Sequence, residues 1–193
     1  KIVETVPWYD AKLYASTQVM DEARHVEVFA KYLNEKLGGM YPVNAHLGML
    51  LDDIITDSRW DMTYLGMQIM VEGLALAAFG YMHELTGEPL LKKLLRYVMS
   101  DEARHVAFGV LSLKEVYDGM SDAEMKDRQE FAFEASIRMR DRFLQQEVWE
   151  HMGVKPRDVI PLVLQDPTRA FFQQLLFAKI VPNCKKLGLL DRN

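Results

Sequence analysis

The sequence is poor in several features that would point to other kinds of protein. It holds one cysteine, Cys184, so no disulfide can form within the chain and a reducing compartment is favoured. It has no stripe of basic residues: 23 lysines and arginines face 28 acidic residues, which gives no reason to expect nucleic acid as a partner. The first ten residues lack the apolar stretch of a signal peptide.

Long hydrophobic runs are also scarce. The most apolar run, residues 69–81, is interrupted by Glu72 and is shorter than the roughly 20 residues that a membrane span requires. The sequence therefore predicts a cytoplasmic protein without a membrane partner.

Strand-like alternation is missing as well, and apolar residues recur at helical spacing. The pattern predicts four long helices, over about residues 7–37, 53 or 58 to 85, 89–117 and 121–151, and two shorter helices over 158–164 and 167–186. A loop with Pro42, Asn44 and Gly48 is expected after the first helix, and Ser121 with Glu124 has the spacing of a capping box. Long helices with short connections favour an antiparallel bundle. We expect residues 1–153 to form this bundle and residues 154–193 to pack on it as a helical extension.

One motif occurs twice. Asp-Glu-Ala-Arg-His occupies residues 21–25 and again residues 101–105. Each copy places a glutamate and a histidine three residues apart on one helical face, where a carboxylate oxygen and an imidazole nitrogen can bind one ion. Two copies on facing helices predict a site for two ions of iron, manganese or zinc, because the ligands are too rich in nitrogen for calcium or magnesium. The predicted ligands are the glutamates and histidines of the two copies: Glu22, His25, Glu102 and His105.

Glu72 is a fifth candidate ligand and the candidate catalytic residue. It is a single carboxylate in an apolar stretch, and its burial is costly unless a positive charge meets it. A metal pair would supply that charge, and Glu72 would then bridge the ions. The alternative is a buried ion pair with Arg24 or Arg104. Glu84 competes for the bridging role, but its place at a helix end predicts exposure.

Small side chains beside Glu72 leave room on its helix, either for a substrate cavity or for close packing of another helix. They are Gly73, Ala75, Ala77 and Ala78. Four larger apolar residues are candidates to line such a cavity and are equally suited to a core: Phe29, Leu76, Phe79 and Phe108.

Over about residues 7–119 the sequence resembles the ferritin-like di-iron carboxylate superfamily. In its members, two helices each give a glutamate and two others each give Glu-x-x-His. The doubled motif is most similar to the oxygen-activating branch, which includes monooxygenase hydroxylases, ribonucleotide reductase small subunits and related oxidases. The resemblance implies an all-α, antiparallel four-helix bundle with extra C-terminal helices. It also implies two iron ions, or manganese with iron, and O2 as co-substrate.

The resemblance assigns roles around the ligands. Asp21 and Asp101 would orient the ligating histidines across the site, and Arg24 and Arg104 would pair with these aspartates. The glutamate of the family's first helix would lie about one helical hairpin before Glu22. We therefore expect the first bundle helix to lie outside the given sequence.

Three positions differ from particular relatives. Phe29 stands where tyrosyl-radical reductase subunits place a tyrosine, which argues against a radical of that type but suits the manganese/iron variants. Leu76 stands where methane and toluene monooxygenases carry a threonine. Val98 stands where arylamine N-oxygenases place an extra histidine, which argues against their seven-ligand site.

The leading hypothesis is a di-metal oxidase or oxygenase that acts on a small organic substrate. An electron-donor protein and a second copy in a homodimer are the expected partners. Three alternatives stay open: a ferritin-like iron store or ferroxidase, a radical-generating subunit of the reductase type, and a structural bundle with vestigial ligands.

Overall fold

A computed structural model describes residues 1–190, which form helices and no strands. Four long helical stretches dominate. Three are single helices: α2 (Tyr9–Lys36), α6 (Pro89–Tyr117) and α7 (Asp122–Arg142). The fourth is a continuous run of α4 (Trp60–Tyr64), η1 (Leu65–Val71) and α5 (Glu72–Leu85). The shorter helices are α1 (Ile2–Thr5), α3 (Ala45–Thr56), α8 (Gln146–His151), α9 (Pro156–Gln165) and α10 (Pro167–Lys186). The predicted all-α helical bundle is confirmed.

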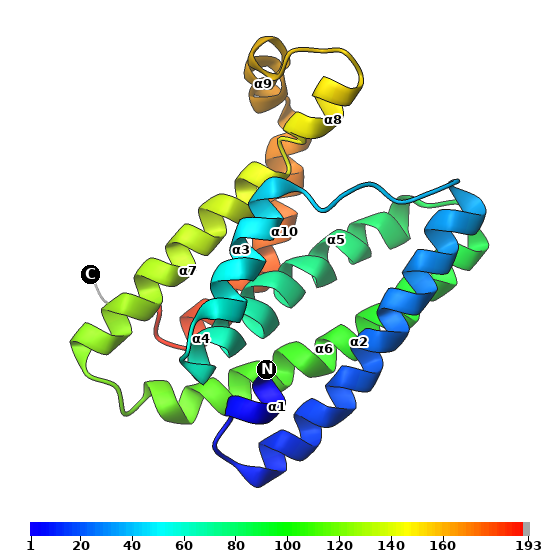
Figure 1. Cartoon of the computed structure of the whole chain (residues 1–193). Coiled ribbons are helices and arrows are strands. Elements are labelled where there is room, and N and C mark those ends of the chain that lie inside the picture. Colours follow the sequence, from blue (N-terminus) through cyan, green and yellow to red (C-terminus); the bar gives the residue numbers. More distant parts are fainter. Residues whose placement is uncertain (191–193) are drawn as a thin grey trace.

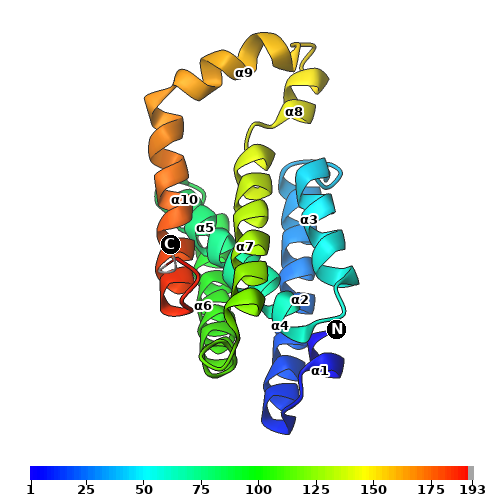
Figure 2. The same ribbon diagram turned by 90° about the vertical axis from the view of Figure 1, so that its left-hand side faces the viewer.

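The long helices pack side by side around one core (Figure 1). α5 and α6 form an antiparallel hairpin, α2 lies along the other side of α6, and α10 packs on α5. α3 packs on α7, while α8 and α9 extend beyond one end of the bundle (Figure 2). The core between them is apolar, with Leu65, Ile69, Leu113, Met139 and Ile180 all buried.

The prediction of a loop after the first long helix is wrong for the second half of that segment, because residues 45–56 form α3. The Asn44 side chain caps this helix by accepting hydrogen bonds from the backbone N–H groups of the next turn. Leu50 and Ile54 then share one face and are buried in the core. Gly48 lies inside the helix, so its weak helix propensity is outweighed by this burial.

α7 begins as predicted but ends earlier. Ser121 and Glu124 form the expected capping box, with the Glu124 carboxylate 2.9 Å from the Ser121 backbone nitrogen. The helix stops at Arg142 rather than near residue 151. Gln145 adopts φ 54°, in the left-handed region, and this turn separates α7 from α8.

The run Trp60–Leu85 is 26 residues long and apolar enough to cross a membrane by length and composition alone. The apolar helix thus extends beyond the run 69–81 that was considered in the sequence and reaches the length of a span. Half of its most apolar window is buried inside the protein, as expected for a core helix. Its centre is the π-helix η1, a wide and rare turn that occurs often at functional sites. Glu72 follows directly after this π-helix.

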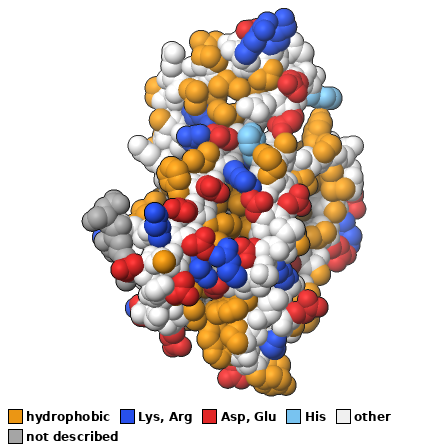
Figure 3. Space-filling view, turned by 60° about the vertical axis from the view of Figure 1, so that its left-hand side comes forward, with side chains coloured by type: hydrophobic (Ala, Val, Ile, Leu, Met, Phe, Trp, Pro, Cys, Tyr) orange, Lys and Arg blue, Asp and Glu red, His pale blue; other side chains and the backbone are white. Residues whose placement is uncertain are grey.

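Charged side chains of both signs mingle over the face that α3 and α7 form (Figure 3). Arg138 of α7 pairs with Asp53 of α3, and Arg59, just before α4, pairs with Asp127 of α7. Both pairs lie at the surface, where each contributes little to stability.

Gly109 marks the closest approach of α6 to η1. A Cβ atom at this position would lie 2.5 Å from Cβ of Gln68. Gly109→Ala should therefore force the two helices apart and lower the free energy of unfolding by about 1–3 kcal/mol. Urea unfolding measures this, with Gly80→Ala in α5 as the control. At Gly80 the new methyl group has space, so we expect unchanged or slightly higher stability, and an equal loss in both variants would contradict the packing.

Candidate metal centre

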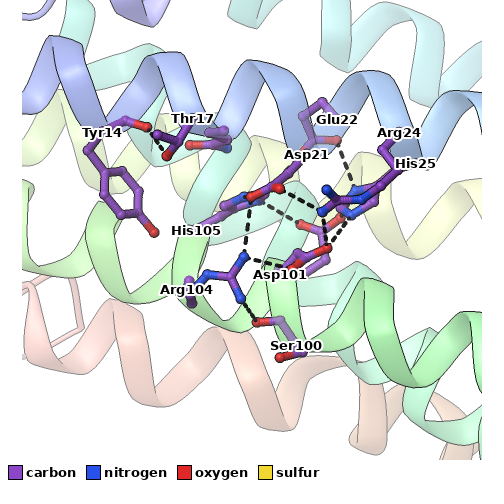
Figure 4. A network of polar contacts seen from close by, with 12 residues as sticks. Tyr14, Thr17, Asp21, Glu22, Arg24, His25, Ser100, Asp101, Arg104 and His105 are labelled. Atoms are coloured by element: carbon purple, nitrogen blue, oxygen red, sulfur yellow. Dashed lines mark hydrogen bonds and ion pairs between the residues drawn. The ribbon is translucent and has the colours of Figure 1, made fainter.

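The two copies of the repeated motif face each other on antiparallel helices. α2 carries Glu22 and His25, and α6 carries Glu102 and His105 (Figures 1 and 4). The fifth predicted ligand, Glu72, opens α5 beside them. Ligand oxygen and nitrogen atoms of four of these residues, all except His25, lie within 4.8 Å of one another. The fold therefore brings all five predicted ligands together, and their role as ligands stays a prediction.

Glu22 and Glu102 each reach both histidines. Nδ1 of His25 lies 3.5 Å from Oε2 of Glu22 and 3.3 Å from Oε1 of Glu102. Nδ1 of His105 lies 3.1 Å from Oε1 of Glu22 and 3.4 Å from Oε2 of Glu102. Each carboxylate thus spans the site with one oxygen directed to each side, as a bridging ligand would.

Glu72 lies nearer to one side. Its Oε2 is 3.9 Å from Nδ1 of His105, and no contact with His25 accompanies this one. Without ions, Glu22 and Glu102 are the carboxylates that contact both histidines, and bridging by Glu72 stays a prediction. The competitor Glu84 is exposed near the end of α5, as expected.

Five buried atoms at this site lack a hydrogen-bond partner. They are Oε1 of Glu22, Nδ1 of His25, Oε2 of Glu72, Oε2 of Glu102 and Nδ1 of His105. Leaving buried polar atoms unpartnered is costly, and such atoms call for an explanation such as an unseen ion. Two cations among these atoms would satisfy all five. Three carboxylates and two imidazoles are a donor set that suits iron or manganese, so the residues present fit a metal pair.

A ring of hydrogen bonds holds the histidines from behind (Figure 4). Nε2 of His25, on α2, donates to Asp101 of α6 at 3.1 Å, and Nε2 of His105 donates to Asp21 of α2 at 3.2 Å. The crossing follows from the antiparallel helices, since each motif copy is turned over relative to the other. With Nε2 engaged in this way, Nδ1 of each imidazole is directed to the carboxylates.

Two arginines close the ring. Arg24 donates to Asp21 at 2.6 Å and to Asp101 at 2.8 Å. Arg104 donates to the same two aspartates, at 3.3 Å and 2.7 Å. These contacts match the pairing that the resemblance implies. They also argue against the alternative for Glu72, because both arginines pair with aspartates and neither pairs with Glu72.

Sequence reasoning missed two glutamines that hold Glu72. Nε2 of Gln18 donates to Oε1 of Glu72 at 2.8 Å, and Gln68 donates to Oε1 of Gln18 at 3.3 Å. Both glutamines are buried. Helical spacing could have found them, since Gln18 lies four residues before Glu22 and Gln68 lies four residues before Glu72. Their effect is to fix one oxygen of Glu72 and leave the other for the site.

The small residues beside Glu72 serve close packing. A Cβ on Gly73 would lie 3.5 Å from Ile180 of α10, and Ala77 is buried in the same core. Sequence reasoning left open whether these small side chains border a substrate cavity or pack against another helix. In the structure, α10 packs there.

The family model for AurF, p-aminobenzoate N-oxygenase, matches residues 3–188. The chain belongs to this family. AurF proteins are di-iron oxygenases of the ferritin-like superfamily, so the resemblance read from the doubled motif is confirmed. No curated protein and no solved structure matches the chain.

Val98 does not place the chain outside the AurF family. It is buried one turn before Glu102, at the position where arylamine N-oxygenases carry their extra histidine. A valine side chain cannot bind a metal ion. This member of the AurF family therefore has a predicted ligand set without a histidine at position 98.

Protons occupy the ligand set of the metal-free protein. Burial lowers the pKa of His25 and of His105, but the close carboxylates of Glu102 and Glu22 outweigh it and raise both to about 10. Burial raises the pKa of Glu22, yet the two histidines beside it bring it down to about 2. Burial and the neighbouring Glu102 raise the pKa of Glu72 to about 8. Near neutral pH two imidazolium groups thus offset the carboxylates.

Stability of the metal-free AurF-family protein should fall as pH rises above about 6.5. The folded state holds protons on His25 and His105 up to about pH 10, while the unfolded state releases them near its ordinary pKa of 6.5. Glu72 acts in the same direction between its ordinary 4.5 and about 8. The stability from these groups is thus complete at low pH and is lost on the alkaline side.

Thermal unfolding in chelator at several pH values tests this. The stabilisation that added Zn(II) provides should have the opposite pH dependence, because metal binding needs deprotonated ligands. The increase in Tm on metal addition should therefore grow as pH rises. A Tm of the metal-free protein that stays constant from pH 6.5 to 9 would contradict the assignment.

Proposed function

We propose that this AurF-family chain is a di-iron oxygenase that adds oxygen from O2 to the amino nitrogen of a small aromatic amine. The observation that carries the proposal is the convergence of five unpartnered, buried ligand atoms inside a family of N-oxygenases. A structural bundle without metal would have to hold these atoms as buried pairs of imidazolium and carboxylate groups. The family match favours oxygenation over iron storage.

The iron pair, when bound, would supply the electrons for O2 and the reactivity toward the substrate. The chain supplies position. Glu22 and Glu102 hold the two sides of the site at a fixed separation, and Asp21 and Asp101 hold each imidazole with Nδ1 directed inward. Gln18 holds one oxygen of Glu72 and keeps this carboxylate on the side of His105.

Access is easiest beside Glu22, whose side chain is 45% exposed although Glu72 and Glu102 are buried. One turn beyond His25 on α2, Phe29 packs against Phe79 of α5 with ring centroids 5.4 Å apart. The pair forms an apolar surface one helical turn from His25. A flat aromatic amine suits such a surface, because aromatic pairs gain energy from offset contacts.

A single turnover with labelled oxygen tests the proposal. The full-length protein is loaded with Fe(II) without air, mixed with p-aminobenzoate as probe and exposed to ¹⁸O₂. We expect a product that carries ¹⁸O on nitrogen, detected by mass spectrometry. Glu102→Ala should give no product, whereas Glu115→Ala, an exposed carboxylate on the same helix, should react as the parent does.

Other outcomes separate the rival functions. Oxygen on a ring carbon would keep the oxygenase and overturn the N-oxygenase. Uptake of many irons per chain without product would favour a ferritin-like store. A stable radical that needs a second protein for use would favour the reductase-type subunit.

A further inference from the structure

A continuous line of aromatic rings runs from Tyr14, on the helix that carries two of the predicted ligands, to the surface. Trp8 meets Trp60 with ring centroids 5.1 Å apart, and Trp60 meets Tyr64 at 5.4 Å. Tyr64 meets Phe108 at 5.4 Å, and Phe108 meets Tyr14 at 4.1 Å. The rings come from α2, α4, α6 and the turn before α2, so the fold and not local sequence assembles them.

The two ends of this line lie in different surroundings. At the inner end, Tyr14 lies on α2 two turns before Glu22, on the helix that also carries Asp21 (Figure 4). Asp21 accepts from Arg104 and from His105, so Tyr14 lies close to the groups that hold a predicted ligand. At the outer end, Trp8 is 41% exposed to solvent.

The chemistry of these rings sets them apart from ordinary core residues. Tryptophan and tyrosine are among the side chains that lose an electron most readily, and four of the five rings belong to them. The Phe29–Phe79 pair, which also lies beside the site, contains no such ring. Tyr64 is fully buried, and its hydroxyl has only a weak contact with Ser112. Packing alone would favour phenylalanine there, since a poorly partnered buried hydroxyl costs free energy.

We propose that this line of rings carries oxidising equivalents from the metal centre to Trp8 when no substrate is bound. The inference rests on the proposed function, because an O2-oxidised metal pair is the oxidant. Its effect would be to protect the site from oxidising its own side chains.

The electrons and protons balance at each step. Tyr14 gives one electron to the oxidised metal pair and its phenolic proton to water, which reaches this half-buried side chain. Trp60 then gives an electron to Tyr14 across Phe108 and Tyr64, and Tyr14 takes a proton back from water. Trp8 next gives an electron to Trp60. Trp8, now one electron short, is restored by a soluble thiol, which is oxidised to a thiyl radical and releases its proton.

Flash oxidation of the Zn(II)-loaded full-length protein tests the route, because zinc neither changes oxidation state nor activates O2. A light-driven oxidant in solution removes an electron from Trp8, and optical and EPR spectra follow the tryptophanyl and tyrosyl radicals. We expect the tryptophanyl radical to convert rapidly into a tyrosyl radical, at a rate independent of protein concentration. Trp60→Phe should lose this fast phase.

Trp149→Phe is the matched control. It also removes one indole, but from α8, where Nε1 of Trp149 donates to the carbonyl of Leu144 at 3.0 Å. Tyr14→Phe removes only a hydroxyl group and should abolish the tyrosyl radical signal even if Trp60→Phe folds poorly. Tyr9→Phe, at an exposed neighbour of Trp8, should leave the signal unchanged.

Equal transfer in Trp60→Phe and Trp149→Phe would overturn the proposal, as would a tyrosyl radical that survives Tyr14→Phe. Failure of N-oxygenation leaves this measurement unaffected, since it uses neither iron, O2 nor amine. A second readout uses the iron-loaded protein and O2 without substrate. There, Trp60→Phe should gain oxygen atoms on peptides around the site, by mass spectrometry, faster than Trp149→Phe.

Discussion

Glu102→Ala should leave the protein unable to hold a pair of metal ions and should remove its oxygenase activity. The Glu102 carboxylate lies 3.3 Å from Nδ1 of His25 and 3.4 Å from Nδ1 of His105. Its loss therefore removes a predicted ligand oxygen from both sides of the site. Its removal would also leave the two imidazoles with only Glu22 between them. Elemental analysis and a Co(II) titration followed by visible absorption measure the effect.

A graded comparison makes the result specific to the site. Asp101→Asn keeps every ligand but weakens the hold on His25, so we expect metal binding to weaken by about 10–100-fold without being abolished. Glu115→Ala should bind as the parent does. Full metal content in Glu102→Ala would contradict the proposed ligand set.

Asp61→Ala should lower the free energy of unfolding by about 3–5 kcal/mol, because it removes the buried counter-charge of a buried arginine and leaves Arg128 only its contact with the exposed Asp127. Arg128 of α7 donates to both carboxylate oxygens of Asp61 of α4, at 2.9 and 3.2 Å. The two side chains are only 9% and 6% exposed. Equilibrium urea unfolding of the metal-free protein measures the loss.

The surface pair of Arg138 and Asp53 provides the matched control. Arg138→Ala breaks an ion pair to the same helix, α7, but at the surface, and should cost at most about 1 kcal/mol. Replacing Asp61 and Arg128 together by apolar residues of similar volume should recover much of the stability. Losses of similar size in Asp61→Ala and Arg138→Ala would show that burial of the Asp61 pair does not set its strength.

Much of the site follows from the sequence because its signal is local. Two Glu-x-x-His pairs at helical spacing put four candidate ligands on two helical faces, and Glu72 stands out as a charge in an apolar stretch. The fold then brings these five residues together. The crossed contacts of Asp21 and Asp101 came from the family resemblance, and the antiparallel helices account for them.

The remainder depends on contacts between distant segments. Gln18 and Gln68 gain their role only because α2 and η1 meet at Glu72. α3 forms because its apolar face packs against α7. Pro42 and Gly48 made this segment resemble a loop in the sequence. The ring line to Trp8 joins four segments and has no local pattern.

Several expectations from the sequence stay predictions. They are the division at residue 153, the cytoplasmic location, the electron-donor protein, the homodimer and the first-helix glutamate ahead of Lys1. α10 does pack on α5 and contributes Leu176 and Ile180 to the core. The C-terminal helical segment therefore shares the core of the bundle.

Metal content per chain tests the central claim most directly. The full-length protein, purified without chelator, is analysed for all transition metals, before and after anaerobic loading with Fe(II). The account predicts about two ions per chain, either two irons or one manganese with one iron, as in two-metal carboxylate bundles. A folded protein that binds no metal even after loading would contradict it and leave a structural helical bundle.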